Sequence, residues 1–221
     1  MFIPRRVVIS IACAMALAVT SCASAPQQAQ QKPGDDTAVS DQQAQDAAAL
    51  ALFQQAYETL GKGNRAEAVP EMERLYREII DRYPRAALAQ EAYWRLILIC
   101  LRDYSPPAFD KAEELHMRFL ALHPDSHFRA EIDNTLTESY GKNKQWERML
   151  RMYTPAVRKY IETGKLAQAR DMFMYAEAKY GLNDLVEAEK GYKIVIALFP
   201  RTRESSLAAE RIKEIKGKKL K

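Results

Sequence analysis

The stretch ARDMFMYAEAKYGLNDLVEAEKGYKIVIALFP, residues 169–200, decides the fold of this chain. Each half repeats apolar residues at the three-to-four-residue spacing of an amphipathic helix. Asn183 lies between the halves, and asparagine tolerates the left-handed backbone conformation that a tight turn requires. Pro200 closes the stretch, and proline is common just beyond a helix end. The stretch therefore predicts two helices joined by a short turn.

Related helix pairs precede this stretch. Pro84 and Pro124 follow amphipathic segments as Pro200 does. A third pair without a closing proline fits between residues 124 and 169, and Pro155 predicts a kink in its second helix. The pattern resembles the tetratricopeptide repeat, a helix pair of about 34 residues with small residues at close crossings. In residues 169–200 the matching positions are Met172, Ala176, Leu185, Ala188, Tyr192, Ile196 and Pro200.

The predicted fold class is all-α, an α-solenoid of about four helix pairs over residues 47–200 with a capping helix and basic tail in residues 201–221. The cap is expected from Glu204 to Lys216 because Leu207, Ile212 and Ile215 would face inward. Two interpretations of the tail remain open, a solvated frayed end and contact with anionic lipid head groups. Its lysines are Lys213, Lys216, Lys218, Lys219 and Lys221.

The N-terminus has the features of an export signal. Arg5 and Arg6 precede the apolar run 7–19, which is shorter than the roughly 20 residues of a membrane-spanning helix. The sequence Val-Thr-Ser-Cys ending at Cys22 resembles the lipobox of bacterial lipoproteins, which implies a signal peptide over residues 1–21 and diacylation of Cys22. Ala23 after the cysteine implies sorting to the outer membrane by that family's rule. The alternative is an ordinary secretory signal cut after Ala25.

Residues 22–46 are predicted to be a lipidated cysteine followed by a disordered Gln-rich tether, because they contain one large aliphatic residue and no aromatic one. Cys13 would leave with the signal and Cys22 would be acylated, so no intramolecular disulfide is expected. Cys100 lies inside an apolar helical stretch and is predicted to be a buried structural thiol.

The composition argues against nucleic-acid binding and enzymatic chemistry. The chain has 33 basic and 29 acidic residues, without the strong basic excess of nucleic-acid binders. It contains no phosphate-binding loop, nucleophile elbow or zinc signature, so no enzyme activity and no cofactor are expected. His116, His123 and His127 are close in sequence, but no acid or cysteine completes a four-ligand set, which disfavours a metal site.

A concave binding groove is the expected functional surface, because stacked helix pairs curve. In tetratricopeptide proteins the first helix of each pair lines the groove. Aromatic residues and arginine beside acids suit a protein or peptide partner, although some of the aromatics would instead pack between repeats. The matching positions in the four units are Phe53 and Tyr57, Trp94 and Leu98, Asn134 and Glu138, and Arg170, Phe173, Glu177 and Tyr180.

The segment 92–126 carries a more specific resemblance. Asp110-Lys111-Ala112 and the stretch Arg118 to Pro124 resemble the BamD (YfiO) family of outer-membrane lipoproteins, which belongs to the machinery that folds β-barrels into the outer membrane. The resemblance implies a palmitoylated lipoprotein on the periplasmic side of the outer membrane that contacts protein partners. The chain departs from the family in having four predicted pairs and a cap where the family has five repeats.

Two other function classes stay open. One is a tetratricopeptide adaptor for another envelope complex, such as secretion, pilus or cell-wall machinery. The other is a cryptic metal or ligand binder that uses the three histidines. Bound partners in the first case and bound metal in the second would separate them.

Overall fold

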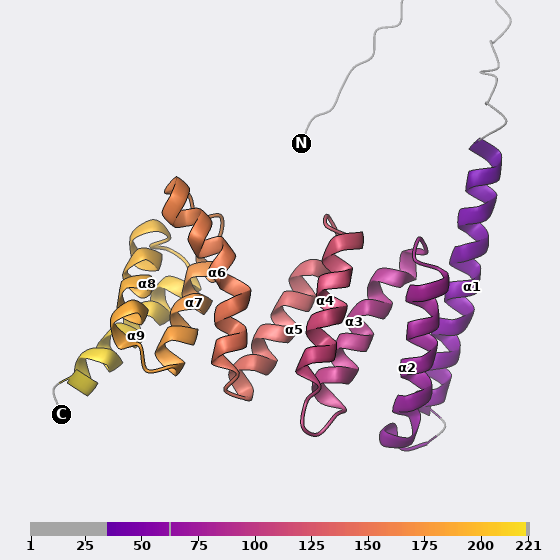
Figure 1. Cartoon of the computed structure of the whole chain (residues 1–221), viewed down its shortest axis with the longest axis horizontal. Helices are drawn as coiled ribbons and strands as arrows, with labels where there is room; N and C mark the ends of the chain where they lie inside the picture. Colours follow the sequence, from indigo (N-terminus) through magenta and orange to yellow (C-terminus); the bar gives the residue numbers. More distant parts are fainter. Residues whose placement is uncertain (1–34, 62, 220–221) are drawn as a thin grey trace, which may run out of the picture.

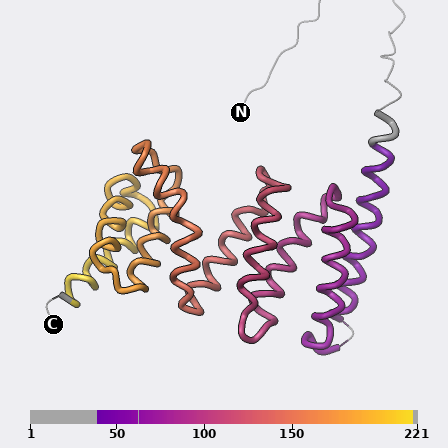
Figure 2. The backbone as a smooth tube through the Cα atoms, in the orientation of Figure 1, coloured from indigo at the N-terminus to yellow at the C-terminus, as the bar shows by residue number. Residues whose placement is uncertain are grey.

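The computed structural model describes residues 35–61 and 63–219. This part of the chain forms nine helices and no strand, so the all-α prediction is confirmed. The helices are α1 (Asp35–Gly61), α2 (Arg65–Arg82), α3 (Ala87–Arg102), α4 (Phe109–Leu122), α5 (Phe128–Lys142), α6 (Trp146–Thr163), α7 (Ala169–Gly181), α8 (Leu185–Leu198) and α9 (Arg203–Lys219). They stand in an elongated row and alternate in direction (Figures 1 and 2).

The predicted helix boundaries agree with the structure at the turns and exits. Asn183 has a φ of 62°, in the left-handed region, which is the conformation expected for the turn between α7 and α8. The helices α2, α4 and α8 end two residues before Pro84, Pro124 and Pro200 respectively. The helix α6 continues through Pro155 to Thr163, and Gly164 with a φ of 68° ends it.

The packing of successive helices is regular in the first half of the row and interrupted in the middle. The helix α1 packs against α2 and α3, and α3 packs against α4 and α5. The helix α6 packs mainly against α7, and within the described residues α5 makes no close backbone contact with α7. The row is therefore not stacked uniformly from end to end.

Two apolar clusters follow from this packing. The larger one is built mainly from α1 to α5 and includes Tyr93, Phe119 and Cys100. The smaller one joins α7, α8 and α9 around Tyr192. The helix α6 contributes Tyr153 to the first cluster and Val157 to the second. Cys100 is fully buried, as predicted, and burial raises the pKa of its thiol to about 11.

Ion pairs tie the even-numbered helices to one another. Arg118 of α4 lies 2.7 Å from Asp81 of α2. Arg148 of α6 reaches back to Asp110 and Glu113 of α4, at 2.7 and 2.8 Å. These pairs are partly exposed, so each contributes little to the free energy of unfolding.

The tether prediction is wrong for residues 35–46, which form the first turns of α1. This segment contains four aspartates, three glutamines and two alanines. It has no proline or glycine, so nothing in it breaks a helix. Two tertiary hydrogen bonds hold it. The Gln42 side chain donates to the Arg85 carbonyl at 2.9 Å, and Asp46 accepts from the Ala87 backbone N–H at 2.8 Å. Residues 22–34 lie outside the described part of the chain.

The helix predicted from Glu204 to Lys216 lies within α9. Ile215 is fully buried, and Leu207 and Ile212 are partly buried against the smaller apolar cluster. The helix packs on both α7 and α8. It therefore covers the apolar surface that the last helix pair would otherwise expose.

The Gly181→Ala substitution is expected to destabilise the contact between α6 and α7. A Cβ atom on Gly181 would overlap the indole ring of Trp146, so the indole must leave its packed position. Overpacking of this kind costs about 1–3 kcal/mol. Thermal unfolding followed by circular dichroism measures the effect. Gly217→Ala is the matched control, because a Cβ atom there meets no neighbour; equal melting temperatures for the two variants would contradict the packing described.

Candidate partner-binding groove

An apolar notch lies between α1 and α3, over the floor that α2 provides. Its volume is about 120 Å³, which suits a single apolar side chain better than a whole ligand. The notch is lined by Phe53, Tyr57, Leu60, Arg65, Met72, Tyr76, Arg95, Leu98 and Ile99. Three of the predicted groove residues, Phe53, Tyr57 and Leu98, therefore meet in one place. This notch is the candidate site.

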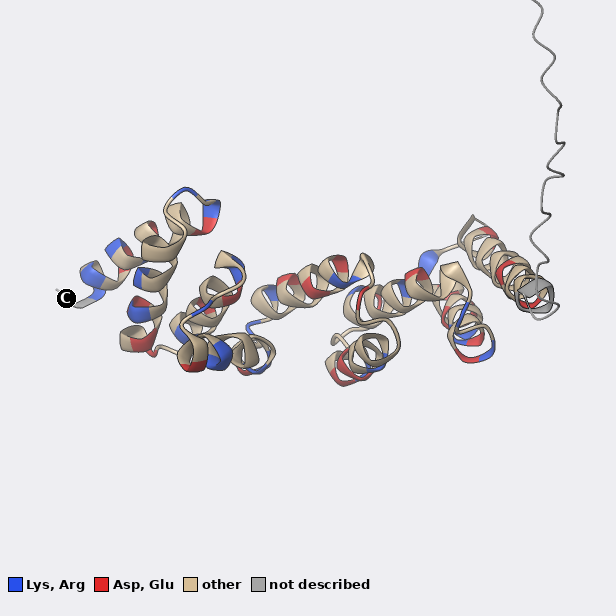
Figure 3. Cartoon of the chain, turned by 90° about the horizontal axis from the view of Figure 1, so that it is seen from above, with Lys and Arg blue, Asp and Glu red and all other residues tan. Residues whose placement is uncertain are grey.

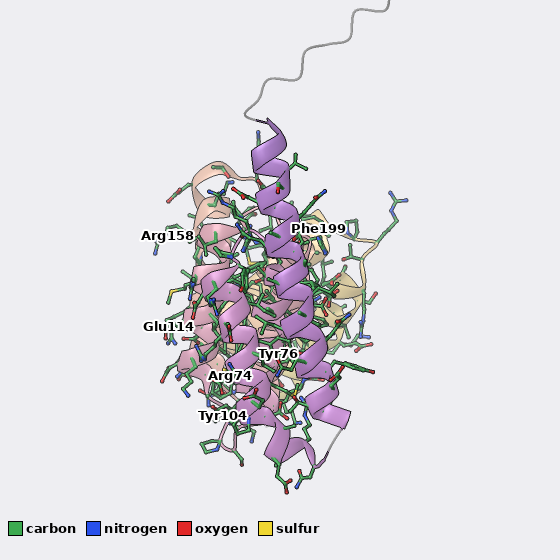
Figure 4. All side chains as sticks on the ribbon, turned by 90° about the vertical axis from the view of Figure 1, so that its right-hand side faces the viewer. Arg74, Tyr76, Tyr104, Glu114, Arg158 and Phe199 are labelled. Atoms are coloured by element: carbon green, nitrogen blue, oxygen red, sulfur yellow. The ribbon has the colours of Figure 1, made fainter. Side chains whose placement is uncertain are left out.

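The helix periodicity of α1 positions the aromatic wall of the notch. Phe53 and Tyr57 are four residues apart, so they occupy one face of the helix. The Phe53 ring packs edge-on against Tyr76 of α2, with ring centroids 5.2 Å apart. Figure 4 views the molecule from the α1 end and labels Tyr76 beside that helix. Tyr57 is 74 % exposed, so its ring is available for contact with a partner.

Two arginines give the rim of the notch a positive surface. Arg65 donates two hydrogen bonds to Asp103, at 2.6 and 2.8 Å, and the carboxylate raises the pKa of that guanidinium. Arg95 pairs with Glu91 at 2.6 Å. In both pairs the arginine side chain is more exposed than the carboxylate, 50 % against 10 % for Arg65 and Asp103. A partner therefore meets the cations before the acids.

Trp94, a predicted groove residue, bridges α3 and α5. Its indole N–H donates to the Thr135 hydroxyl at 3.2 Å, and its ring centroid lies 6.0 Å from that of Phe128. Arg95 also lies over the ring, 5.0 Å from its centroid. Most of the Trp94 ring is thus engaged within the molecule, so its main role is to pack the two helices together.

Asn134 and Glu138 on α5 are both exposed, as the groove prediction requires. Glu138 faces an open cavity of about 670 Å³ between the end of α3 and α5, whose lining includes Arg102, Ser139 and Lys142. This part of the surface is polar, in contrast to the notch. The sequence pattern did not reveal the cavity, because it depends on the long loop 103–108.

The assignment of Phe173, Glu177 and Tyr180 to an open groove is corrected by the structure. Phe173 is buried in the smaller apolar cluster against Tyr192. Glu177 accepts hydrogen bonds from Arg211 of α9 at 2.8 and 3.0 Å, and also from the Tyr192 hydroxyl.

Tyr180 and Arg170 complete the fourth unit. The Tyr180 hydroxyl donates to Glu214 at 3.1 Å, and Arg211 and Lys218 both lie over its ring. The helix α9 thus occupies the surface that was predicted to be a groove. Arg170 is half-buried on α7, which is not stacked on α5. Of the predicted groove residues, Tyr57, Asn134 and Glu138 are the exposed ones among the described residues, and they lie on α1 and α5.

The three histidines have different neighbours. His116 lies with its Nε2 atom 2.9 Å from Asp133. His123 packs against the rings of Tyr93 and Phe119, and burial lowers its pKa. His127 stacks on Phe128. Within the described residues no group of three or more His, Cys, Asp or Glu side chains is placed to hold a metal ion.

The predicted lipidation site, Cys22, and the predicted signal peptide lie outside the described residues. Among the helices of residues 35–61 and 63–219, none has the length and apolar character needed to cross a bilayer. No protein-family model matches this chain, and no curated protein matches its sequence.

Proposed function

We propose that this protein is a non-enzymatic scaffold lipoprotein of the cell envelope, anchored through Cys22, whose helices form tetratricopeptide-like pairs that bind a protein partner. The observation that carries the binding role is the notch. It combines an exposed tyrosine, an apolar floor and a cationic rim, and rigid aromatic residues beside arginine dominate the energetics of protein interfaces. The antiparallel order of the helices and the capping of the last pair by α9 support the repeat assignment.

The partner chemistry that fits the notch is an apolar side chain next to acidic groups. The cavity between Phe53, Tyr57 and Leu98 accepts the apolar group, and Arg65 and Arg95 attract the acids. The β-barrel assembly machinery of the outer membrane is the partner that the resemblance of residues 92–126 implies. An adaptor role in another envelope complex uses the same surface with a different client.

The direct test is a crosslinking pull-down of the tagged full chain from detergent-solubilised envelopes. The matched control is the Cys22→Ser variant, which removes the acylated thiol. We expect the wild-type chain to recover components of the β-barrel assembly machinery and the variant to leave the membrane fraction. Recovery of a secretion, pilus or cell-wall complex would replace the assembly role with the adaptor role. Recovery of no protein by a chain that is correctly anchored would overturn the scaffold proposal.

The Tyr57→Ala substitution is expected to weaken partner binding by about 2 kcal/mol, or roughly thirtyfold, because tyrosines in such pockets are typical hot spots. The melting temperature should stay near that of the wild type, since the Tyr57 side chain is mostly in solvent. Val186→Ala, at an exposed position outside the notch, is the matched control. Equal partner recovery by the two variants would show that the notch is not the binding site.

A further inference from the structure

Four loops of the row lie on one edge of the molecule. Successive helices alternate in direction. Loops 83–86, 123–127, 164–168 and 199–202 therefore all lie along the upper side of the row in Figure 1, the side on which α1 has its N-terminal end. We call these loops, with the adjoining helix ends, the upper edge. Figure 3 looks down onto it. The lower edge holds loops 103–108, 143–145 and 182–184.

Exposed apolar side chains recur on the upper edge at corresponding positions. Leu122 and Leu198 are the last residues of α4 and α8, and Ile161 lies in the last turn of α6. All three are among the exposed large hydrophobic residues of the structure, and Ile161 is 76 % exposed. A single exposed leucine needs no explanation. Recurrence near the C-terminal ends of three alternate helices, α4, α6 and α8, on one edge suits contact with an apolar phase.

Basic residues accompany these apolar side chains. Arg85, Lys165 and Arg201 lie in three of the four loops and are all exposed. The adjoining helix ends add the exposed Arg82, Arg129, Arg158, Lys159 and Arg203, and Figure 4 labels Arg158 in the upper half of the molecule. The exposed acids are Asp41 near the start of α1, Asp125 in loop 123–127, Glu131 and Glu162 near the helix ends, and Asp81, which Arg118 binds; Arg82 is itself paired with Glu78. The edge therefore has a basic excess alternating with apolar side chains.

The start of α1 gives this edge its position relative to the anchor. Residues 22–34 connect Cys22 to α1, whose N-terminal end lies on the upper edge. A chain spans at most about 3.5 Å per residue, so this segment reaches no further than about 45 Å. An acylated Cys22 would thus keep the start of α1 within about 45 Å of the bilayer, while Tyr57 and the notch lie toward the opposite end of α1.

We propose that the upper edge is a membrane-contacting surface that lies on an anionic bilayer. Leu122, Ile161 and Leu198 enter the boundary between head groups and acyl chains, and Arg85, Lys165 and Arg201 face the lipid phosphates. The proposal rests on the proposed anchor only for delivery to the membrane. In this orientation the row of helices lies along the bilayer, and the notch faces away from the membrane.

A fluorescence measurement on the full chain tests this orientation. The chain is purified from membranes, reconstituted into vesicles of equal parts phosphatidylcholine and phosphatidylglycerol, and floated so that only vesicle-bound protein is read. An environment-sensitive fluorophore is attached in separate variants to Ile161→Cys and Val186→Cys. Val186 is an exposed apolar residue near the lower edge, which makes it a matched control. The identically treated wild-type chain corrects for labelling of the native cysteines, of which Cys100 is buried.

We expect lipids with nitroxide head groups to quench the Ile161 label several-fold more than the Val186 label, and its emission to shift to shorter wavelength. Lys165→Glu with Arg201→Glu, added to the Ile161 variant, should bring quenching close to the Val186 level. Equal quenching of the two labels overturns the proposal. Mass spectrometry of the N-terminus tests the anchor separately. Stronger quenching of the Ile161 label in a chain without an acyl group supports the membrane-contacting edge and overturns the anchor. Equal quenching of the two labels in an acylated chain supports the anchor and overturns the edge.

Discussion

Replacing Tyr192 with alanine is expected to lower the free energy of unfolding of the C-terminal helices by about 3–5 kcal/mol, the usual cost of emptying a large aromatic site. Tyr192 is fully buried at the centre of the smaller apolar cluster, where its ring centroid lies 5.8 Å from that of Phe173. Its hydroxyl donates to Glu177, which also holds Arg211 of α9. The substitution therefore removes the packing between α7 and α8 and weakens the attachment of α9.

Hydrogen exchange is the measurement, because the loss should be local. Stability in an array of helix pairs is close to a sum of unit and neighbour contributions. We expect the amides of α7, α8 and α9 to lose protection while those of α1 to α4 keep it. Tyr192→Phe is the control; it retains the ring and removes one hydrogen bond to a charged acceptor, at a cost of about 1.5–3 kcal/mol. Uniform loss of protection along the chain would contradict the division into two apolar clusters.

Replacing Trp94 with alanine is expected to cost about 3 kcal/mol of stability, near the lower end for a large aromatic residue because Trp94 is only partly buried. The substitution removes the contact with Phe128 and leaves Thr135 without the indole donor. With roughly 2–4 °C for each kcal/mol in a chain of this size, the melting temperature should fall by about 6–12 °C. Thermal unfolding followed by circular dichroism measures it.

The sequence pattern alone supports a different expectation for Trp94, namely weaker partner binding at unchanged stability. Tyr57→Ala is therefore the informative comparison, since Tyr57 occupies the corresponding surface on α1 but is mostly exposed. A Trp94→Ala variant that melts with the wild type and loses its partner would return Trp94 to the groove. The structure predicts that Trp94→Ala lowers the melting temperature and that Tyr57→Ala weakens partner binding.

The helices were predictable because each boundary has a local cause. Asn183 marks a turn, and Pro84, Pro124 and Pro200 mark exits. The helical start of α1 was missed because its support is not local: the Gln42 and Asp46 side chains bond to Arg85 and Ala87, about 40 positions away. A composition rule for disorder counts apolar residues and does not register such hydrogen bonds.

The candidate site was predicted in part for a similar reason. Phe53, Tyr57 and Leu98 converge because helical periodicity fixes the faces of α1 and α3. Glu177 and Tyr180 have the same periodicity on α7, but the place of α9 decides their environment. The motif indicates that α9 caps the last pair and does not indicate which side chains it covers. Arg211 and Glu214 of α9 make the contacts with Glu177 and Tyr180 of α7, and their spacing of three residues predicts only an ion pair within α9.

Site-specific photocrosslinking from the notch tests the central claim most directly. A photoreactive phenylalanine analogue is placed at position 57 of the full chain in living cells, and at position 186 as the control. Both side chains are exposed, at 74 % and 58 %, and they lie on different helices. We expect the probe at position 57 to crosslink a discrete envelope protein and the probe at position 186 not to do so. Identical crosslinks from both positions, or none from position 57, would contradict a partner-binding notch.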